Sequence, residues 1–352
     1  MSTEIPKFDE VFAEMTAPGG LSAITVRRVF DAIFAGAWTP VTMASFLIAL
    51  RQSEHGTAAV LAAAARAMRA VMIPVAHDFR VLLDTCGTGG DGSASLNLST
   101  AAALIASAAG VPVAKHGNRA ATSRAGSADV LEAMGIPLDV PASRQAEVLA
   151  EAQIAFLFAQ SHHPAMRHVM PVRRELGVRT VFNCLGPLAN PAGASHQLVG
   201  AFDDAIRPVL AGALAELGAT RAWVVRSEDG LDEMSPFAAT RISEVSGGRV
   251  REFILTPEDF GLERSPAGAI DGAEPAHNAR VLEAILKNEA HPARDAILLN
   301  AAAGLVIALD IEPKAATERA RAALESGAAG EALQRLRRAT NARRAEAPGR
   351  VP

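Results

Sequence analysis

The stretch that decides the fold is Val81 to Thr100, which reads VLLDTCGTGGDGSASLNLST. A short apolar run is followed by a glycine-rich segment, Asp84 to Gly92, and an apolar pattern resumes at Leu98. This order is typical of a strand that ends in a phosphate-binding loop before a helix begins, although the spacing matches neither the dinucleotide fingerprint nor the lysine-bearing P-loop. Glycines let backbone amides approach an anion, and amides near Ser99 and Thr100 would add partial positive charge. The sequence therefore predicts a phosphate site, against the alternative of a glycine-rich turn with a serine cap.

Short apolar runs alternate with helical patterns after this point, which indicates parallel βαβ units. The expected strands are Val81 to Asp84, Val111 to Lys115, Ile154 to Ala159, Leu198 to Phe202 and Arg221 to Ser227. The expected helices are Ser99 to Ala109, Ser127 to Met134, Ser143 to Gln153 and Ala205 to Leu217, three of them with Ser as N-cap. Residues 241–255 predict a hairpin around Gly247 and Gly248, followed by helices near Leu282 and Leu298 and a charged helix from Glu312.

The first 80 residues or so predict helices. An apolar stripe from Val26 to Phe34 is closed by Gly36, Thr39 opens a second helix, and an alanine-rich third helix follows Gly56. We therefore expect an α/β protein with a small N-terminal helical domain and a larger α/β domain that has a central, mostly parallel sheet. The tail from Ala345 to Pro352 is expected to be frayed.

Composition excludes several classes of protein. The 352 residues carry 34 Lys and Arg against 38 Asp and Glu, and aromatic residues make up 4% with no tyrosine, so a nucleic-acid partner is not expected. The uncharged stretch after Gly92 holds too many polar residues for a membrane span, and no signal peptide is visible at the start. With Cys86 and Cys184 as its only cysteines, the chain is expected to be cytoplasmic with both thiols reduced.

Charge near the predicted phosphate loop points to a divalent cation. Between Asp84 and Gly135 the side chains sum to a charge of −1, from the cations Lys115, Arg119 and Arg124 and the anions Asp84, Asp91, Asp129 and Glu132. A polyanion would then need backbone dipoles and Mg²⁺, which prefers carboxylate, water and phosphate oxygens. The adjacent Asp232 and Glu233, in the turn after the expected strand ending at Ser227, are candidates for that cation. A solvated acidic turn is the alternative.

Two further segments carry candidate ligand-binding residues. In KHGNR, from Lys115 to Arg119, both cations could bind an anion and Asn118 could hydrogen-bond an amine or hydroxyl, unless this is only a solvated basic loop. At helical spacing Arg173 shares an apolar stripe with Met166, Val169 and Leu176, so its guanidinium needs a protein carboxylate or a ligand anion. The nearby histidines, His162, His163 and His168, lack the i, i+4 spacing of a helical zinc pair.

Several long motifs in one order resemble the anthranilate phosphoribosyltransferase family. They are GTGGDG at Gly87, NLST at Asn97, KHGNR at Lys115, GSADVLE at Gly126, HPAMRHVMPVRRELG at His163, FNCLGPLANP at Phe182 and DGLDE at Asp229. The resemblance covers residues 20–310. It implies a helical N-terminal domain over residues 1–80, joined by a mid-chain segment of about residues 163–190, and an α/β phosphoribosyltransferase domain over residues 81–345.

The resemblance also implies the activity. Such a protein transfers 5-phosphoribosyl from phosphoribosyl pyrophosphate to the amine of anthranilate, in tryptophan biosynthesis, with Mg²⁺ and usually as a homodimer. The residues that resemble phosphoribosyl pyrophosphate contacts are Gly87, Thr88, Gly89, Gly90, Asp91, Asn97, Ser99, Thr100 and Lys115. Those that resemble the anthranilate pocket are Gly87, Asn118, His163, Arg173, Gly186 and Pro187, and those that resemble metal sites are Ser99, Asp232 and Glu233. An aryl amine is already nucleophilic, so no residue is assigned as acid or base.

Rival interpretations remain open on the same scaffold. A nucleoside phosphorylase is disfavoured because KHGNR stands in place of its Ser/Thr-Gly-Gly stretch. A non-catalytic nucleic-acid-binding paralogue is disfavoured by the intact DGLDE and the net charge of −4. A phosphoribosyltransferase for another aromatic acceptor is the third alternative. Arg226-Ser-Glu before Asp229 and Ala120-Ala-Thr-Ser after KHGNR depart from the usual family pattern and affect loop detail more than chemistry.

Overall fold

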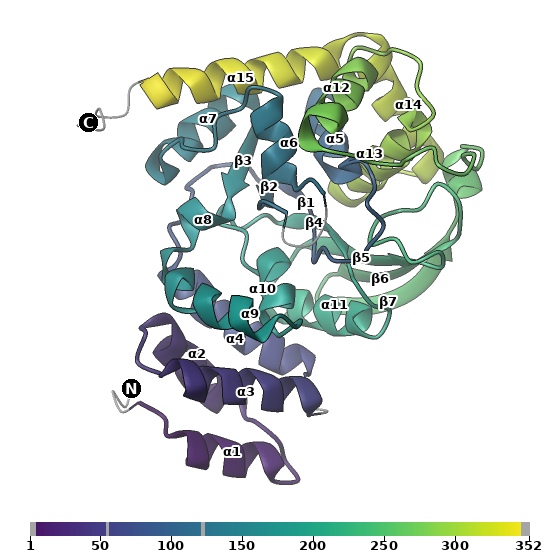
Figure 1. Ribbon diagram of the computed structural model, residues 1–352. Coiled ribbons are helices and arrows are strands. Elements are labelled where there is room, and N and C mark those ends of the chain that lie inside the picture. Colours follow the sequence, from purple (N-terminus) through teal and green to yellow (C-terminus); the bar gives the residue numbers. More distant parts are fainter. Residues whose placement is uncertain (1–4, 54–55, 121–123, 346–352) are drawn as a thin grey trace.

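The computed structural model describes residues 5–53, 56–120 and 124–345, and its core is one seven-stranded sheet (Figure 1). The strand order is β3-β2-β1-β4-β5-β6-β7, with β1 to β5 parallel and β6 and β7 antiparallel. The strands are β1 (Leu83–Gly87), β2 (Val113–Gly117), β3 (Ile154–Phe158), β4 (His196–Gly200), β5 (Arg221–Ser227), β6 (Thr240–Ser246) and β7 (Arg249–Leu255). The predicted α/β class with a mostly parallel sheet is confirmed.

Helices surround this sheet and fill the N-terminal part of the chain. Before the sheet come α1 (Phe8–Thr16), α2 (Ala23–Phe34), α3 (Pro40–Gln52) and α4 (Ala58–Val71). Between the strands lie α5 (Leu98–Ala108), α6 (Ser127–Ala133), α7 (Gln145–Ala152), α8 (Ala159–His162), α9 (Met170–Leu176), α10 (Phe182–Leu188) and α11 (Ile206–Glu216), with 3₁₀ turns at Ala142–Arg144 and Pro164–His168. After the hairpin come a 3₁₀ turn at Pro257–Phe260 and α12 (Pro275–Leu286), α13 (Arg294–Leu309), α14 (Pro313–Glu325) and α15 (Ala328–Ala345).

Each face of the sheet packs against its own hydrophobic cluster. Figure 1 shows α5, α13 and α15 over one face, and their small residues let helices and strands approach closely. The other face packs against α11, α4 and α10, in a cluster that also contains α2 and α3. In that cluster Val169, Val172 and Phe182 of the mid-chain segment lie with Phe30 and Phe46 of the N-terminal helices. The mid-chain segment therefore packs with the N-terminal helices.

Several predicted boundaries need correction. β2 begins and ends two residues later than predicted, and β4 two residues earlier. β1 begins two residues later and ends three later, because it pairs with β4 in register as far as Gly87 and Gly200 and so extends into the glycine-rich motif. None of the three serines is an N-cap: α5 is capped at Asn97, α6 at Gly126, and α7 begins only after a 3₁₀ turn. The amide group of Asn97 donates instead to the carbonyl of Ala125, and Asp129 accepts from the backbone of Gly126.

Two helices expected to be continuous are broken. The stripe with Arg173 spans a 3₁₀ turn and α9, which separate at Val169, and Pro171 lies in the first turn of the new helix. The charged helix from Glu312 is two helices, α14 and α15, because Gly327 takes a left-handed φ of +80° between them. Among the described residues no single helix is long and apolar enough to cross a membrane; α13 and α14 pass that test only as a pair, bent by 116°. Most of the predicted frayed tail lies outside the described residues.

Candidate active site

A cleft of about 740 Å³ lies where the carboxyl ends of β1, β2, β4 and β5 meet. Ligands of open α/β sheets bind at this edge. Most residues predicted for the site line the cleft: Gly87, Thr88, Gly89, Gly90, Asp91, Asn97, Ser99, Lys115, Asn118, His163, Arg173, Gly186, Pro187, Asp232 and Glu233. Thr100 does not line it, because this residue points into the core and its hydroxyl is buried there. The structure therefore brings all of these predicted residues except Thr100 together at one cleft.

The glycine-rich loop leaves β1 and is tied to the end of β4. The backbone amide of Thr88 donates to the carbonyl of Gly200 at 2.9 Å, and the Thr88 hydroxyl accepts from the backbone amide of Phe202 at 2.9 Å. Gly89 and Gly90 then take φ values of +64° and +82°, which L side chains rarely adopt. The Thr88 amide is used by Gly200, and the Gly89 amide donates to Asp232. The amides that such a turn can aim at an anion, as phosphate-binding loops require, are therefore those of Gly90 and Asp91.

Lys115, on β2, supplies a buried positive charge beside this loop. Its ammonium group donates to the Ser99 hydroxyl at 3.2 Å and to the carbonyl of Thr85. Burial lowers the pKa of Lys115, while the nearby carboxylates of Asp84 and Glu233 oppose that shift. Ser99 is also held through its backbone, since its carbonyl accepts from the Thr85 hydroxyl at 2.9 Å. A charged amine and the first turn of α5 therefore meet at the phosphate end of the cleft.

Two buried histidines lie deeper, between the phosphate end and α10. His116 Nδ1 lies 3.0 Å from the carbonyl oxygen of Gly186, and its Nε2 lies 3.2 Å from Nε2 of His163. The carbonyl can only accept, so His116 donates through Nδ1 and accepts from His163 through Nε2. Burial lowers the pKa of His116 to about 3 and that of His163 to about 4. His163 further lowers the pKa of His116, and His162 lowers that of both. Both rings are therefore neutral at pH 7.

Asp232 and Glu233 face the glycine-rich loop from the turn after β5. Asp232 accepts from the backbone amide of Gly89, and Glu233 Oε1 accepts from the backbone amide of Ser99 at 3.2 Å. Burial and then the charge of Asp91 raise the pKa of Asp232 to about 7. Burial and then the charge of Asp232 raise the pKa of Glu233 to about 8. Two crowded carboxylates of this kind are stabilised by a bound cation.

The donor set fits Mg²⁺. Oε2 of Glu233 is buried without a hydrogen-bond partner among the described residues, so one carboxylate oxygen is free for a cation. No group of three or more His, Cys, Asp or Glu side chains in the described part of the chain is arranged to hold a metal. A metal ion here would complete its shell with water or ligand phosphate oxygens, which is how Mg²⁺ usually binds.

Gly200 is required by the close approach of this acidic turn. A Cβ atom placed on Gly200 would lie 1.7 Å from the carbonyl oxygen of Asp232. The last residue of β4 therefore lets the backbone of the acidic turn pass directly against the sheet. Sequence reasoning missed this contact, since one glycine at a strand end carries no signal of what packs on it.

Arg173 lies at the other end of the cleft, with no carboxylate for a partner among the described residues. Its guanidinium is 5.8 Å from the ring centroid of Phe182 and 4.0 Å from the sulfur of Met170. Burial lowers the pKa of Arg173, and no neighbouring anion compensates. The alternative that Arg173 pairs with a protein carboxylate is not what the structure shows. Its half-buried charge is left for an anion in the cleft.

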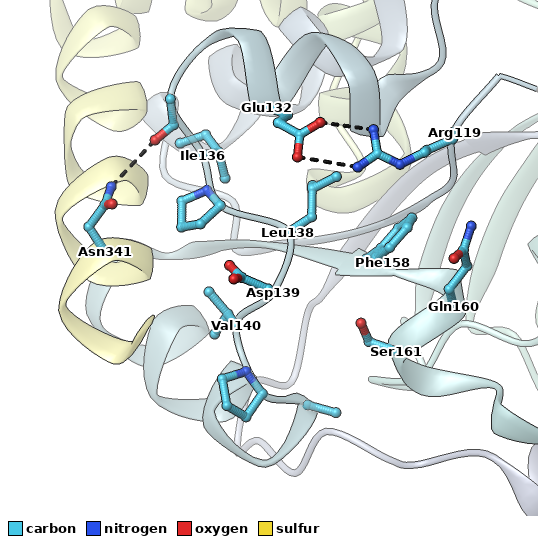
Figure 2. Close-up of a pocket in the computed structure, with 14 residues that line it drawn as sticks. Arg119, Glu132, Ile136, Leu138, Asp139, Val140, Phe158, Gln160, Ser161 and Asn341 are labelled. Atoms are coloured by element: carbon cyan, nitrogen blue, oxygen red, sulfur yellow. Dashed lines mark hydrogen bonds and ion pairs between the residues drawn. The ribbon is translucent and has the colours of Figure 1, made fainter. Parts of the chain in front are cut away.

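Asn118, also at this end, is exposed, and its side-chain oxygen accepts from the backbone amide of Arg119 at 2.8 Å. Arg119 was a candidate for anion binding, but its guanidinium is already paired. It lies 2.8 Å from a carboxylate oxygen of Asp129 and 2.9 Å from one of Glu132. Figure 2 shows the Glu132 pair at the rim of a neighbouring cavity of about 750 Å³. Arg119 therefore supports the loop instead of offering a free charge.

The remaining residues predicted for the anthranilate pocket, Gly186 and Pro187, lie on α10. The carbonyl of Gly186 accepts from His116, and that of Pro187 accepts from Gln197 at 2.8 Å. Sequence reasoning missed Arg179, which lines the cleft and lies 4.6 Å over the ring of Phe202. The dipeptide Arg179-Thr180 is of a kind common in loops, so no local sequence pattern could have indicated the contacts of Arg179.

Comparison with known proteins defines the class of this fold and site. Residues 80–330 match the model of the glycosyl transferase family a/b domain, and residues 14–72 match the helical bundle domain of the same family. Anthranilate phosphoribosyltransferase of Rhodospirillum rubrum is 48% identical over 317 residues, which is 90% of this chain and 91% of the relative. This chain belongs to the anthranilate phosphoribosyltransferase family.

Solved structures agree with this assignment. Anthranilate phosphoribosyltransferase from Thermus thermophilus has a TM-score of 0.87 at 44% identity and covers 95% of this chain and 99% of its own. The enzyme from Saccharomyces cerevisiae, in complex with PRPP and Mg, has a TM-score of 0.87 at 29% identity, covering 95% and 98%. The yeast enzyme in complex with 4-fluoroanthranilate has a TM-score of 0.86 at 27% identity, covering 96% and 99%.

Proposed function

We propose that this protein is a Mg²⁺-dependent anthranilate phosphoribosyltransferase. It transfers 5-phosphoribosyl from phosphoribosyl pyrophosphate to the amine of anthranilate and releases pyrophosphate, the second step from chorismate in tryptophan biosynthesis. One observation carries the proposal: a single cleft joins a glycine-rich anion loop beside an acidic pair to Arg173, for which the described residues supply no carboxylate partner. The names of the relatives support it.

The donor binds at the phosphate end. The loop Gly87 to Asp91 surrounds the pyrophosphate and offers it the amides of Gly90 and Asp91, since those of Thr88 and Gly89 are used within the protein. Lys115 adds a buried positive charge, and Asn97 and Ser99 hold the start of α5. Asp232 and Glu233 hold Mg²⁺ on the pyrophosphate, with Ser99 close to it through Glu233. When bound, the metal stabilises negative charge on the departing pyrophosphate. Thr100 was also assigned to this end, and its burial favours a role in packing α5.

The acceptor binds between α9, α10 and the loop after β2. Arg173 pairs with the carboxylate of anthranilate, and the neutral His163 and the backbone around Gly186 and Pro187 line the ring. Asn118 Oδ1 is occupied by a backbone amide, so its –NH₂ group is the part that faces a ligand acceptor. The site-residue roles stay predictions.

Positioning and electrostatics supply the catalysis. The aryl amine is neutral at pH 7 and needs no strong base, and the two histidines are neutral and hydrogen-bonded to each other and to a backbone carbonyl. The chain therefore contributes by holding the amine next to the anomeric carbon and by placing amides and Lys115 where negative charge develops on the leaving group. The proton of the amine can leave to solvent after the bond forms.

One assay tests the function. Anthranilate fluorescence is followed with phosphoribosyl pyrophosphate and Mg²⁺ present, and then with each of them omitted. Fluorescence loss that needs all three components supports the proposal. No turnover of anthranilate, with turnover of another aromatic amine, would favour a different acceptor, and binding without turnover of any acceptor would favour a non-catalytic protein.

The domain division and the oligomeric state are part of the same proposal. We take residues 1–80 with about 163–190 as a helical domain and 81–345 as the catalytic domain, which the shared cluster of α2, α3, α9 and α10 supports. We expect a homodimer. Large apolar side chains are exposed on α1, α2 and α3, at Phe12, Ile24 and Val41, the last two 75% and 77% exposed. Light scattering of the purified protein measures the oligomeric state. The cytoplasmic location stays a prediction.

A further inference from the structure

Arg179 lines the cleft and contacts its glycine-rich loop. It lies in the segment between α9 and α10, and its guanidinium donates to the carbonyl oxygen of Gly90. The same guanidinium stacks on Phe202, with 4.6 Å between its central carbon and the ring centroid. The backbone amide of Phe202 in turn donates to the hydroxyl of Thr88. Arg179 and Phe202 therefore hold both ends of the Thr88 to Gly90 turn.

The contact with Gly90 fixes one peptide of the loop. In a trans peptide the C=O and N–H groups point in opposite directions, so a carbonyl held by Arg179 aims the amide of Asp91 away from it. Gly90 has a φ of +82°, and glycine crosses between backbone conformations with little steric cost, so this peptide could otherwise flip. A Cβ on Gly90 would lie 3.5 Å from the guanidinium, which shows how closely Arg179 follows the backbone.

The segment that carries Arg179 is itself held in place. The carbonyl of Arg179 accepts from the guanidinium of Arg51, on α3, at 2.9 Å. No carboxylate lies within ion-pair distance of Arg179 among the described residues, so the ring of Phe202 and the backbone of Gly90 are what orient it. Ordering an exposed arginine side chain costs conformational entropy, so a stacked and hydrogen-bonded arginine at the surface indicates a structural role.

We propose that Arg179 is a positioning residue that locks the Gly90–Asp91 peptide so that the loop amides face the phosphates of the donor. The inference rests on the proposed function, since it assigns the loop to phosphoribosyl pyrophosphate. It differs from a direct role in which the charge of Arg179 itself binds a phosphate. The ring of Phe202 separates the two roles, because it orients the guanidinium but offers no charge.

The first measurement needs no substrate. Amide hydrogen exchange of residues 87–92 is compared in the wild-type protein and in Arg179→Ala, Phe202→Leu and the double variant. We expect faster exchange in this segment in both single variants, and little further change in the double variant. Arg251→Ala is the control, because Arg251 also stacks on a phenylalanine, at 5.1 Å, but on β7 and outside the cleft. It should leave exchange at 87–92 unchanged.

Steady-state kinetics provide the second measurement. Losing one hydrogen bond and one stacking contact should raise the KM for phosphoribosyl pyrophosphate about tenfold in Arg179→Ala and leave the KM for anthranilate unchanged. Phe202→Leu should reproduce a large part of that rise. Wild-type exchange in residues 87–92 of Arg179→Ala would overturn the proposal. A normal KM in Phe202→Leu beside a raised KM in Arg179→Ala would also overturn it, in favour of a direct phosphate contact.

The two proposals can fail separately. If the wild-type protein does not convert anthranilate, the proposed function fails, yet the exchange experiment still decides whether Arg179 orders the loop. Inorganic pyrophosphate with Mg²⁺, titrated calorimetrically, then replaces the kinetic arm. Unchanged pyrophosphate affinity in Arg179→Ala would overturn the positioning role.

Discussion

Replacing Arg173 by alanine tests the acceptor end of the cleft. The guanidinium is half-buried, lies near the ring of Phe182 and the sulfur of Met170, and has no ion-pair partner in the described part of the chain. Burial lowers its pKa. A charge-assisted pair with a ligand carboxylate contributes on the order of 1.5 to 3 kcal/mol to binding. Since 1.4 kcal/mol is about tenfold, Arg173→Ala should raise the KM for anthranilate roughly ten- to a hundredfold. The KM for phosphoribosyl pyrophosphate should stay within about twofold.

Stability should change little in the same variant. The lost cation–π contact with Phe182 is worth about 0.5 to 1 kcal/mol at such distances. It is offset by relief of the desolvation of an arginine that has no carboxylate partner among the described residues. Thermal unfolding should therefore stay close to that of the wild type. Arg173→Lys keeps the charge but loses the bidentate geometry of the guanidinium, so its KM for anthranilate should lie between those of the wild type and Arg173→Ala.

Aniline provides the matched control, because it keeps the amine and the ring but has no carboxylate. Inhibition by aniline should be nearly equal in the wild type and in Arg173→Ala. Benzoate keeps the ring and the carboxylate but has no amine, so its inhibition should weaken in the variant. A variant that loses several kcal/mol of stability and binds anthranilate normally would refute the reasoning. It would mean that Arg173 serves the fold.

Three further predictions concern the phosphate end and the buried histidines. The double variant Asp232→Asn, Glu233→Gln removes two carboxylates whose pKa values burial raises, so the melting temperature should stay level or rise. Its Mg²⁺-dependent turnover should fall at least about tenfold, and full activity would exclude the metal role. Gly89→Val places a branched side chain at a φ of +64°, so it should raise the KM for phosphoribosyl pyrophosphate far more than that for anthranilate, and an equal rise in both would indicate general misfolding. Burial lowers the pKa of His116 to about 3, below the usual 6.5, so the unfolded chain binds more protons and the unfolding free energy should fall as pH drops below 6.5. His116→Gln should reduce that slope by about 1.4 kcal/mol per pH unit near pH 5 in urea titrations, and an unchanged slope would contradict the assignment.

The sequence predicted the fold well wherever the pattern was local. Arg221 to Ser227 matches β5 at both ends, since turn residues bound an apolar run, and the hairpin turn at Gly247 and Gly248 lies between β6 and β7 as expected. Strand ends were less predictable. β1 continues to Gly87 only because β4 lies beside it, and the apolar pattern before the loop gave no sign of that pairing.

The prediction of helix N-caps was wrong for a related reason. A serine before an apolar run is a good cap in isolation, but Asn97 caps α5 without a side-chain bond to it, because its amide is already committed to Ala125 and to Asn278. Residues carried by the long motifs, such as Lys115, could be proposed from the sequence, and the structure places Lys115 at the cleft. Arg179 and Gly200 contact partners that are distant in sequence, and a single sequence gives no sign of such contacts.

The contact between Gly200 and the carbonyl of Asp232 has a consequence for how this position can vary. The Cβ atom of any other residue at position 200 would lie 1.7 Å from the carbonyl oxygen of Asp232. No change of rotamer can relieve this clash, because the position of a Cβ atom is fixed by its own backbone and the oxygen also belongs to the backbone. Even alanine would push the acidic turn off the sheet and carry both carboxylates away from the loop. A saturation library at this codon, selected for growth without tryptophan, should therefore return glycine alone.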